Sequence, residues 1–170
     1  MNGRAPFSLM TQLALPLAIL LPLGIAAKPQ LEEVLGPASG LNSPFGVAFD
    51  DRGNAFVAEY EGGRILKLDH SGKLHTLSGN GSKGYAGDGL NAEHGVFHSM
   101  HNVAWASDHM LYVSDTHNNL VRRIHGRTNR LSTLSGVPGQ KGFSGDGGPA
   151  KKAKLDTPIS ISLTPDEKTL

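Results

Sequence analysis

Short hydrophobic runs alternate with turn residues through most of the chain. Each run is rich in β-branched, aromatic and aliphatic side chains, which favour strands. Hydrophobic and polar positions alternate within residues 65–68, 74–77 and 121–124, as they do in strands with one buried face. Turn-forming sequences such as Asp51-Arg52-Gly53-Asn54 separate the runs. The pattern predicts many short strands joined by tight turns.

The order of the runs repeats along the chain. Pro44 in the first copy matches Met100 in the second, and Phe56 matches Tyr112 at the same spacing. The expected strands are residues 44–50, 54–60, 64–68 and 74–79 in the first copy and residues 100–105, 110–115, 120–124 and 131–136 in the second. A third copy opens at residues 158–163.

Four strands in each copy predict an all-β protein. Radial repetition of four-stranded antiparallel units produces a β-propeller, in which each unit is one blade. We assign blade 1 with its linker to residues 42–97, blade 2 with its linker to residues 98–155, and the start of a truncated third blade to residues 156–170. The chain therefore holds about two and a half blades of an incomplete propeller. The uncharged run 46–49 is expected to be an innermost strand that is covered on both faces.

The N-terminal segment 1–27 differs in composition from the rest of the chain. Arg4 is the single charged side chain before Lys28, and the apolar stretch between them ends in small residues. These features predict a secretory signal peptide over residues 1–27, and hence a secreted, periplasmic or cell-envelope protein. An uncleaved membrane anchor is the alternative, although Pro16 and Pro22 interrupt the stretch.

The first copy reads Pro44-Phe45-Gly46-Val47-Ala48-Phe49-Asp50, followed by a strand that ends in an acid and then by Arg64-Ile65. This pattern resembles the NHL repeat. The linker Gly142-Phe143-Ser144-Gly145-Asp146-Gly147 resembles the connection between blades in extracytoplasmic bacterial members of that family. The resemblance covers residues 31–170 and implies a secreted NHL-repeat propeller. The sequence departs from the family pattern at Glu59-Tyr60, Met100 and Leu120.

The N-terminal segment 28–41 contains a possible closure strand. Its sequence Leu31-Glu32-Glu33-Val34-Leu35-Gly36 resembles the last strand of each copy. Propellers often close with such an N-terminal strand in their last blade. Because a closed ring has about four to eight blades, we expect further C-terminal blades to complete it. The alternative is a short protein that assembles with other copies of itself.

The composition excludes several kinds of chemistry. The chain contains no Cys, which excludes disulfides, thiolate metal sites and a cysteine nucleophile. Loss of Arg4 with the signal peptide leaves 15 basic and 15 acidic residues, so we expect no nucleic-acid partner and no membrane contact beyond the signal segment. No nucleophile elbow, phosphate-binding loop or dinucleotide fingerprint occurs. We interpret the basic pairs Arg122-Arg123 and Lys151-Lys152 as solvated.

Six histidines lie close together in the stretch from His94 to His125. His98 and His101 come just before an inner strand, in a loop expected to face one mouth of the central channel. With Phe45 and Asn102 they are the candidate ligand-binding residues at that mouth. In outline the repeat also resembles amidating-lyase propellers, which place zinc-binding histidines at this point in several blades. Only His101 matches by position, because Phe45 and Ile159 stand at the equivalent positions. Since zinc takes about three protein ligands, His101 is a metal candidate without partners here.

Four acids recur at matching positions of the copies. Asp88 and Asp146 occupy Gly-Asp-Gly sequences, and Glu59 and Asp115 end the second strand of their copies. We interpret all four as structural turn acids, because a residue that recurs in every blade is architectural. One acid in each glycine-rich loop falls short of the about six to eight oxygens that calcium takes.

These observations favour an extracytoplasmic scaffold that binds a protein, peptide or carbohydrate without a cofactor. The rival is a metal-dependent propeller enzyme with calcium or zinc in the central channel, either a gluconolactonase-like lactone hydrolase or an amidating-lyase-like protein. Since the fold alone does not give the function, a purely structural repeat is a third possibility.

Overall fold

The computed structural model describes residue 35 and residues 37–170. The signal peptide expected at residues 1–27 and nearly all of the closure strand expected at residues 31–36 lie outside the described residues. Among the residues that are described, no helix is long and apolar enough to cross a membrane.

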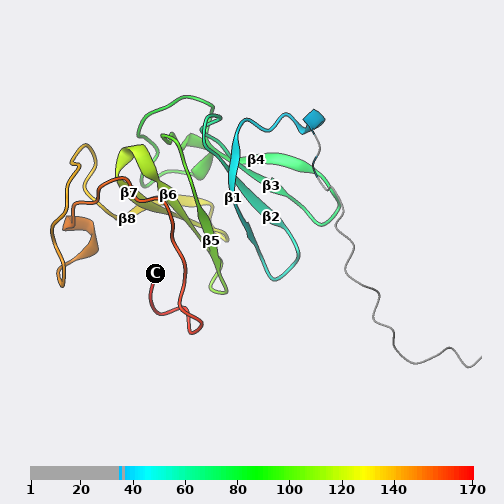
Figure 1. The fold of residues 1–170 in the computed structure, drawn as a ribbon. Helices are drawn as coiled ribbons and strands as arrows, with labels where there is room; N and C mark the ends of the chain where they lie inside the picture. The colour runs from blue at the N-terminus through cyan, green and yellow to red at the C-terminus, as the bar shows by residue number, and fades with distance from the viewer. Residues whose placement is uncertain (1–34, 36) are drawn as a thin grey trace, which may run out of the picture. The chain divides into compact units, whose positions relative to one another are not determined.

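The described chain forms two four-stranded antiparallel sheets, ordered β1-β2-β3-β4 and β5-β6-β7-β8 (Figure 1). The strands are β1 (Pro44–Phe49), β2 (Ala55–Glu59), β3 (Ile65–Leu68), β4 (Leu74–Ser78), β5 (Val103–Ala106), β6 (Met110–Asp115), β7 (Leu120–His125) and β8 (Arg130–Ser135). Short 3-10 helices accompany them: η1 (Pro37–Ser39), η2 (Ala92–His94), η3 (Thr116–Asn118) and η4 (Ala150–Lys152). The prediction of an all-β fold with four-stranded antiparallel blades is confirmed.

Irregular pairing recurs at the same place in both blades. The register shifts directly after Ile65 in β3 and directly after Val121 in β7, which are equivalent positions of the repeat. In β1 a further shift leaves Phe45 as an extra residue between the paired residues Pro44 and Gly46. Because a bulge redirects the extra side chain, Phe45 leaves the alternation of its strand.

The hydrophobic core lies between the two blades. Its buried members come from both sheets and from the linker: Phe56, Ala58, Ile65, Ala92, Phe97, Met100, Val103, Leu111, Val113, Ile124 and Leu131. Trp105 packs against this core, and its ring stacks on that of Phe56 with centroids 4.9 Å apart. The backbones of the blades approach closely at Gly46, where a Cβ atom would lie only 2.7 Å from Asn102 Cα. A larger residue at this position would push the two inner strands apart.

Among the described residues, the inner strand β1 is covered on one face only. Gly46 is buried and Ala48 is half-buried toward blade 2. Val47 and Phe49, on the other face, are 54% and 65% exposed. The uncharged sequence is typical of a strand suited to burial on both sides, but no second sheet of the described residues packs on this face.

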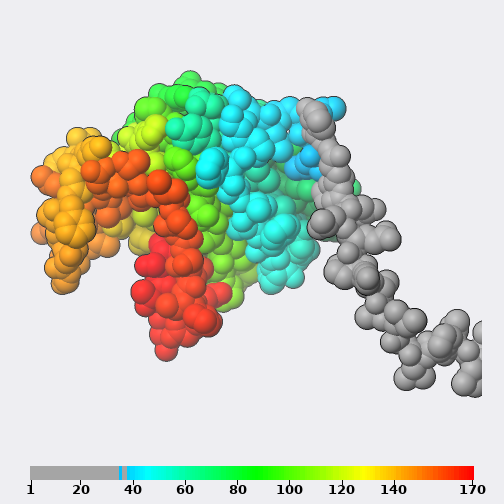
Figure 2. Space-filling view, in the orientation of Figure 1, coloured from blue at the N-terminus to red at the C-terminus, as the bar shows by residue number. Residues whose placement is uncertain are grey.

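Residues 156–170 are expected to begin a third blade, and they form no strand. In blades 1 and 2 the equivalent strand pairs with the second strand of its own blade. Residues 156–170 reach only to about the point where that second strand begins in the repeat. Without a ladder partner a lone segment cannot satisfy its backbone donors and acceptors as a strand does. Figure 2 shows the last residues, in red, projecting from the two blades.

The start of each copy nevertheless keeps one backbone conformation. Ser43, Ser99 and Thr157 stand at the same position of the repeat and have φ values of 52°, 54° and 52°. Positive φ is uncommon for residues other than glycine. The N–H of Thr157 donates to Asn119 Oδ1 at 2.9 Å, which holds the third copy against blade 2.

A buried acid ends the second strand of each blade. Glu59 and Asp115 are both fully buried. Each accepts a backbone hydrogen bond from the loop that leads into its blade, at 2.8 Å from Asn42 N–H to Glu59 and at 2.8 Å from His98 N–H to Asp115. The two donors occupy equivalent positions of the repeat, so the acid ties down the same point of the chain in both blades.

Each buried acid also has an arginine partner, at a different position in each blade. Arg64 donates from Nε and Nη2 to the two oxygens of Glu59 at 2.7 and 2.8 Å. Asp115 lies 3.6 Å from Nη1 of Arg122. Arg122 is fully buried, which corrects the interpretation of Arg122-Arg123 as a solvated pair.

Arg122 is retained inside because both terminal nitrogens of its guanidinium are hydrogen-bonded, although Nε has no partner among the described residues. Its guanidinium donates to the carbonyl oxygens of Val96 and Ala86 at 2.8 and 2.7 Å and to Asp88 Oδ1 at 2.8 Å. It also lies 4.8 Å from the ring centroid of Phe97. A buried cation is tolerated when ion pairs and hydrogen bonds replace its hydration. Arg122 thereby fastens the linker between the blades to blade 2.

Arg122→Leu tests this role with the residue that blade 1 carries at the equivalent position, Leu66. We expect the free energy of unfolding to fall by about 3–5 kcal/mol, because the buried Asp115 loses its cationic partner. Denaturant unfolding followed by circular dichroism measures the loss. The control is Arg123→Leu, which removes one 3.3 Å bond to Ser132 Oγ and should cost less than about 1 kcal/mol. Equal losses in the two variants would contradict the assignment.

Candidate functional site

The residues predicted at a channel mouth lie together at one end of the inner strands. Phe45 is near the start of β1, and His98, His101 and Asn102 come just before β5. Two residues that the sequence did not predict join them from just beyond β2 and β6. We define the ring cluster as the five rings in contact here: Phe45, Tyr60, His98, His101 and His117.

Four of the five ring pairs in this cluster meet edge to face, and the pair Phe45–Tyr60 is tilted at 43°. The centroid of His101 is 4.8 Å from that of Phe45 and 4.8 Å from that of Tyr60, with planes at 76° and 65°. His117 continues the cluster from Tyr60, at 5.9 Å, to His98, at 5.0 Å. Edge-to-face pairs are favoured because a positive ring edge meets a negative ring face. The cluster therefore connects the two blades. Blade 1 contributes Phe45 and Tyr60, and blade 2 contributes His98, His101 and His117.

The tautomer of His101 follows from its hydrogen bonds. Thr116 Oγ1 lies 2.9 Å from His101 Nδ1 and 2.7 Å from the carbonyl oxygen of Pro158. The carbonyl can only accept, so the single hydroxyl proton of Thr116 goes to Pro158 and Thr116 accepts from His101 Nδ1–H. Neutral His101 therefore keeps a lone pair on Nε2.

Asn102, which follows His101 in the chain, has an unused side-chain acceptor. Its backbone N–H donates to Ser114 Oγ at 2.8 Å, and its carbonyl oxygen accepts from Ser114 N–H at 3.0 Å. Its side-chain Oδ1 is buried and has no hydrogen-bond partner within the described part of the chain. A buried acceptor without a partner costs about 1–3 kcal/mol, which a donor from a ligand would offset.

The imidazoles of His98 and His101 are mainly neutral at neutral pH. Burial lowers the pKa of both side chains below the ordinary value of 6.5, and positive charge on His117 lowers it further. At His98 and His101 the ring cluster thus presents uncharged rings with lone-pair acceptors.

Asp115 is the acid with the most perturbed titration. Burial raises its pKa to about 6, against hydrogen bonds from His98 N–H and Asn118 Nδ2 that favour the ionised form. At pH values between 3.8, the ordinary pKa of an aspartate, and 6, Asp115 is more protonated in the folded state than in the unfolded state. Its contribution to stability therefore increases as the pH falls through 6 toward 4, and its full burial keeps it away from any ligand.

The two Gly-Asp-Gly acids have different surroundings. Asp88 accepts from Arg122 Nη2 at 2.8 Å, from Thr133 N–H at 2.8 Å and from Tyr85 O–H at 3.0 Å. Although burial opposes ionisation of Asp88, the bonds from Thr133 and Arg122 hold its pKa below the ordinary value. Asp146 is exposed, and its side chain makes no hydrogen bond or ion pair to any described residue.

Within residue 35 and residues 37–170, no three or more His, Asp or Glu side chains are grouped closely enough to hold a metal ion. His101, the predicted metal candidate, contacts the rings of Phe45 and Tyr60 and the hydroxyl of Thr116. The partners that a zinc site would need at the positions of Phe45 and Ile159 are side chains that cannot ligate a metal.

Tyr60 and His117 are the members of the ring cluster that sequence reasoning missed. Tyr60 follows Glu59 directly, and His117 lies two positions beyond Asp115. In an antiparallel blade the end of the second strand lies beside the start of the first. A side chain that directly follows the acid at the end of the second strand is therefore expected at this end of the blades.

Comparison with known proteins identifies the class of fold. No family model and no curated protein sequence matches the chain. A structural genomics protein of unknown function from Bacteroides thetaiotaomicron matches with a TM-score of 0.60 and 19% identity, over 76% of this chain and 31% of its own. An auxiliary nutrient binding protein from the same organism matches with a TM-score of 0.53 and 16% identity, over 71% of this chain and 32% of its own.

The structural neighbours are β-propellers. Virginiamycin B lyase from Staphylococcus aureus also aligns, with a TM-score of 0.46 and 13% identity, over 74% of this chain and 33% of its own. The chain spans about one third of the length of these neighbours. It has the fold of part of a β-propeller.

Asp88 and Asp146 form a matched pair for mutation. Asp88→Asn should lower the free energy of unfolding by about 1–2 kcal/mol, because it weakens the charged hydrogen bonds to Arg122 and Thr133. Asp146→Asn should change it by less than about 0.5 kcal/mol, as exposed substitutions usually do. Denaturant unfolding of both variants measures the difference. Equal losses would assign the effect to the glycine-rich loop rather than to the ion pair.

His117→Gln should raise the pKa of both His98 and His101, because it removes a positive charge that lowers them. Burial should keep both values below 6.5. NMR titration of the imidazole Cε1–H resonances follows each histidine, and His125→Gln in β7 is the control. If both variants leave the two pKa values unchanged, His117 exerts no charge effect on them.

Proposed function

We propose that this chain is part of an extracytoplasmic NHL-repeat propeller that binds its ligand at the ring cluster. Its blades would comprise residues 42–97 and 98–155, and residues 156–170 would lead into a third blade. A signal peptide at residues 1–27 would direct export, and further blades would close the ring. The ligand would be a carbohydrate, a peptide or a segment of another protein.

The observation that carries this proposal is the convergence of five rings from two blades at one end of the inner strands. Phe45 stands at the edge of the ring cluster and is 65% exposed. A large apolar side chain held by neighbouring rings yet open to solvent is typical of a binding anchor. The likeness to an auxiliary nutrient binding protein, at 16% identity, concerns the fold, so the proposal rests on the ring cluster.

The polar groups beside the rings favour a ligand with hydrogen-bond donors. Asn102 Oδ1 is a buried acceptor without a partner among the described residues, and His101 keeps a lone pair on Nε2. Neutral imidazoles do not select an anion by charge. Hydroxyl groups of a carbohydrate or amide N–H groups of a peptide match these acceptors, while an apolar face of the ligand would pack on Phe45.

Phe45→Ala is the direct test, with Phe49→Ala as its control. Both phenylalanines lie on β1 and are 65% exposed, but only Phe45 contacts the ring cluster. The chain is first screened on arrays of neutral oligosaccharides and short peptides, and the strongest binder is then titrated against each variant. We expect Phe45→Ala to weaken binding about tenfold or more and Phe49→Ala to leave it unchanged. An equal loss in both variants would show that the ring cluster is not the binding site.

A metal-dependent propeller enzyme is the rival proposal, with His101 as one ligand of calcium or zinc and the other ligands in further blades. Elemental analysis of the purified chain distinguishes the two. About one equivalent of zinc or calcium for each chain, lost in His101→Ala, would favour the enzyme. A metal content that does not change between the wild type and His101→Ala would count against it.

A further inference from the structure

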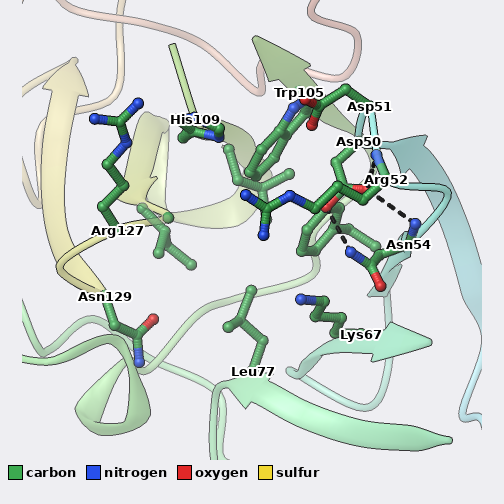
Figure 3. Close-up of a pocket in the computed structure, with 14 residues that line it drawn as sticks. Asp50, Asp51, Arg52, Asn54, Lys67, Leu77, Trp105, His109, Arg127 and Asn129 are labelled. Atoms are coloured by element: carbon green, nitrogen blue, oxygen red, sulfur yellow. Dashed lines mark hydrogen bonds between the residues drawn. The ribbon is translucent and has the colours of Figure 1, made fainter. Parts of the chain in front are cut away.

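A second candidate site lies at the opposite end of the same two blades. A pocket of about 600 Å³ opens between the sheets there (Figure 3). Its walls come from three turns, those that connect β1 to β2, β5 to β6 and β7 to β8. The apolar side chains that line the pocket lie at the end of the core that is nearest to these turns. They are Phe56, Leu77, Trp105, Leu111 and Ile124.

Three cationic side chains from three different elements line this pocket: Arg52, Lys67 and Arg127. No hydrogen bond or ion pair from their charged groups occurs to any residue that the structure describes. In Figure 3 the Arg52 guanidinium lies in the middle of the pocket, and Arg127 extends from the opposite wall. Cations that share a partly enclosed, apolar-walled space concentrate positive potential in it.

The acids of the pocket offset these cations only in part, with Asp50 interacting electrostatically with Lys67. Asp50 Oδ1 accepts from the backbone N–H groups of Arg52 and Asn54 at 3.0 and 2.9 Å, and Asp50 Oδ2 accepts from Asn54 Nδ2 at 2.7 Å. The Asp50 carboxylate is thus engaged in its own turn. Asp51 is the second acid of the lining, so the charged side chains comprise three cations against two acids.

Trp105 adds a hydrogen-bond donor to the apolar wall. One face of its ring stacks on Phe56, with the planes 7° apart. Its indole Nε1–H is buried and has no acceptor among the described residues. A buried donor without a partner is destabilising, and an acceptor brought by a ligand would satisfy it.

We propose that this pocket binds a small organic anion, such as a sugar that carries a carboxylate or a phosphate group. The anionic group would pair with Arg52, Arg127 and Lys67, because guanidinium groups bind carboxylates and phosphates with two parallel hydrogen bonds. The body of the ligand would lie against Trp105 and the apolar lining. This site is separate from the ring cluster, and the inference does not depend on the function proposed for that cluster.

Trp105 makes the pocket directly observable, because it is the only tryptophan of the chain. The 170-residue chain is titrated with glucuronate, glucose 6-phosphate and glucose while tryptophan emission is recorded. We expect a saturable change with one or both anions and none with glucose. The two anions distinguish a carboxylate site from a phosphate site. The absence of a saturable change with both anions up to about 10 mM, weaker than any ordinary small-molecule site, would overturn the proposal, as would an equal response to glucose.

The double variant Arg52→Gln/Arg127→Gln should weaken anion binding about 100-fold, at about tenfold for each charged hydrogen-bonding partner lost. The double variant Lys73→Gln/Lys152→Gln, at exposed lysines outside the pocket, is the charge-matched control and should not change the affinity. Circular dichroism and thermal unfolding establish that each variant is folded. Phe45→Ala should leave the Trp105 response intact, so a failure of the ring-cluster proposal is distinguishable from a failure of this one. Unaltered binding in the folded Arg52→Gln/Arg127→Gln variant would refute the assignment of the pocket.

Discussion

A carboxylate buried at the end of the second strand determines how each blade begins. A charge in that position is stable only when it is paired, and Glu59 and Asp115 each bind both a backbone N–H of the incoming loop and an arginine. The acid therefore fixes the loop that leads into the inner strand. His98 donates this bond in blade 2 and also carries a ring of the cluster. The geometry of the candidate site thus depends on a buried ion pair.

The contact between the blades creates both candidate sites. Gly46 lets β1 and β5 come together, and the core fills the space behind them. At one end of this contact, rings from the two blades meet around His101. At the other end the core is open, and Trp105 marks the boundary between packed interior and pocket. The two ends differ in charge as well, since the imidazoles of His98 and His101 are mainly neutral and the pocket holds three cations against two acids.

The strands were predictable from the sequence because strand burial and turn chemistry repeat at a nearly fixed distance along the chain. The residues of the mouth were predictable in part, since Phe45 and His101 occupy the start of an inner strand. Arg122 could not be read correctly, because a basic pair on a strand looks solvated until the linker that covers it is placed. The contacts of Tyr60 and His117 were not predicted, because they depend on which ends of different strands meet, and the repeat alone does not show this.

The different positions of Arg64 and Arg122 have a consequence for how the two blades diverged. Each acid is matched in length and placement to the arginine of its own blade, with Glu59 served by Arg64 just before β3 and Asp115 served by Arg122 within β7. A hybrid that joined the second strand of one blade to the third strand of the other would hold a buried acid and an arginine at mismatched positions. Whole blades can therefore be duplicated or exchanged, but pieces of blades cannot be recombined without changing acid and arginine together.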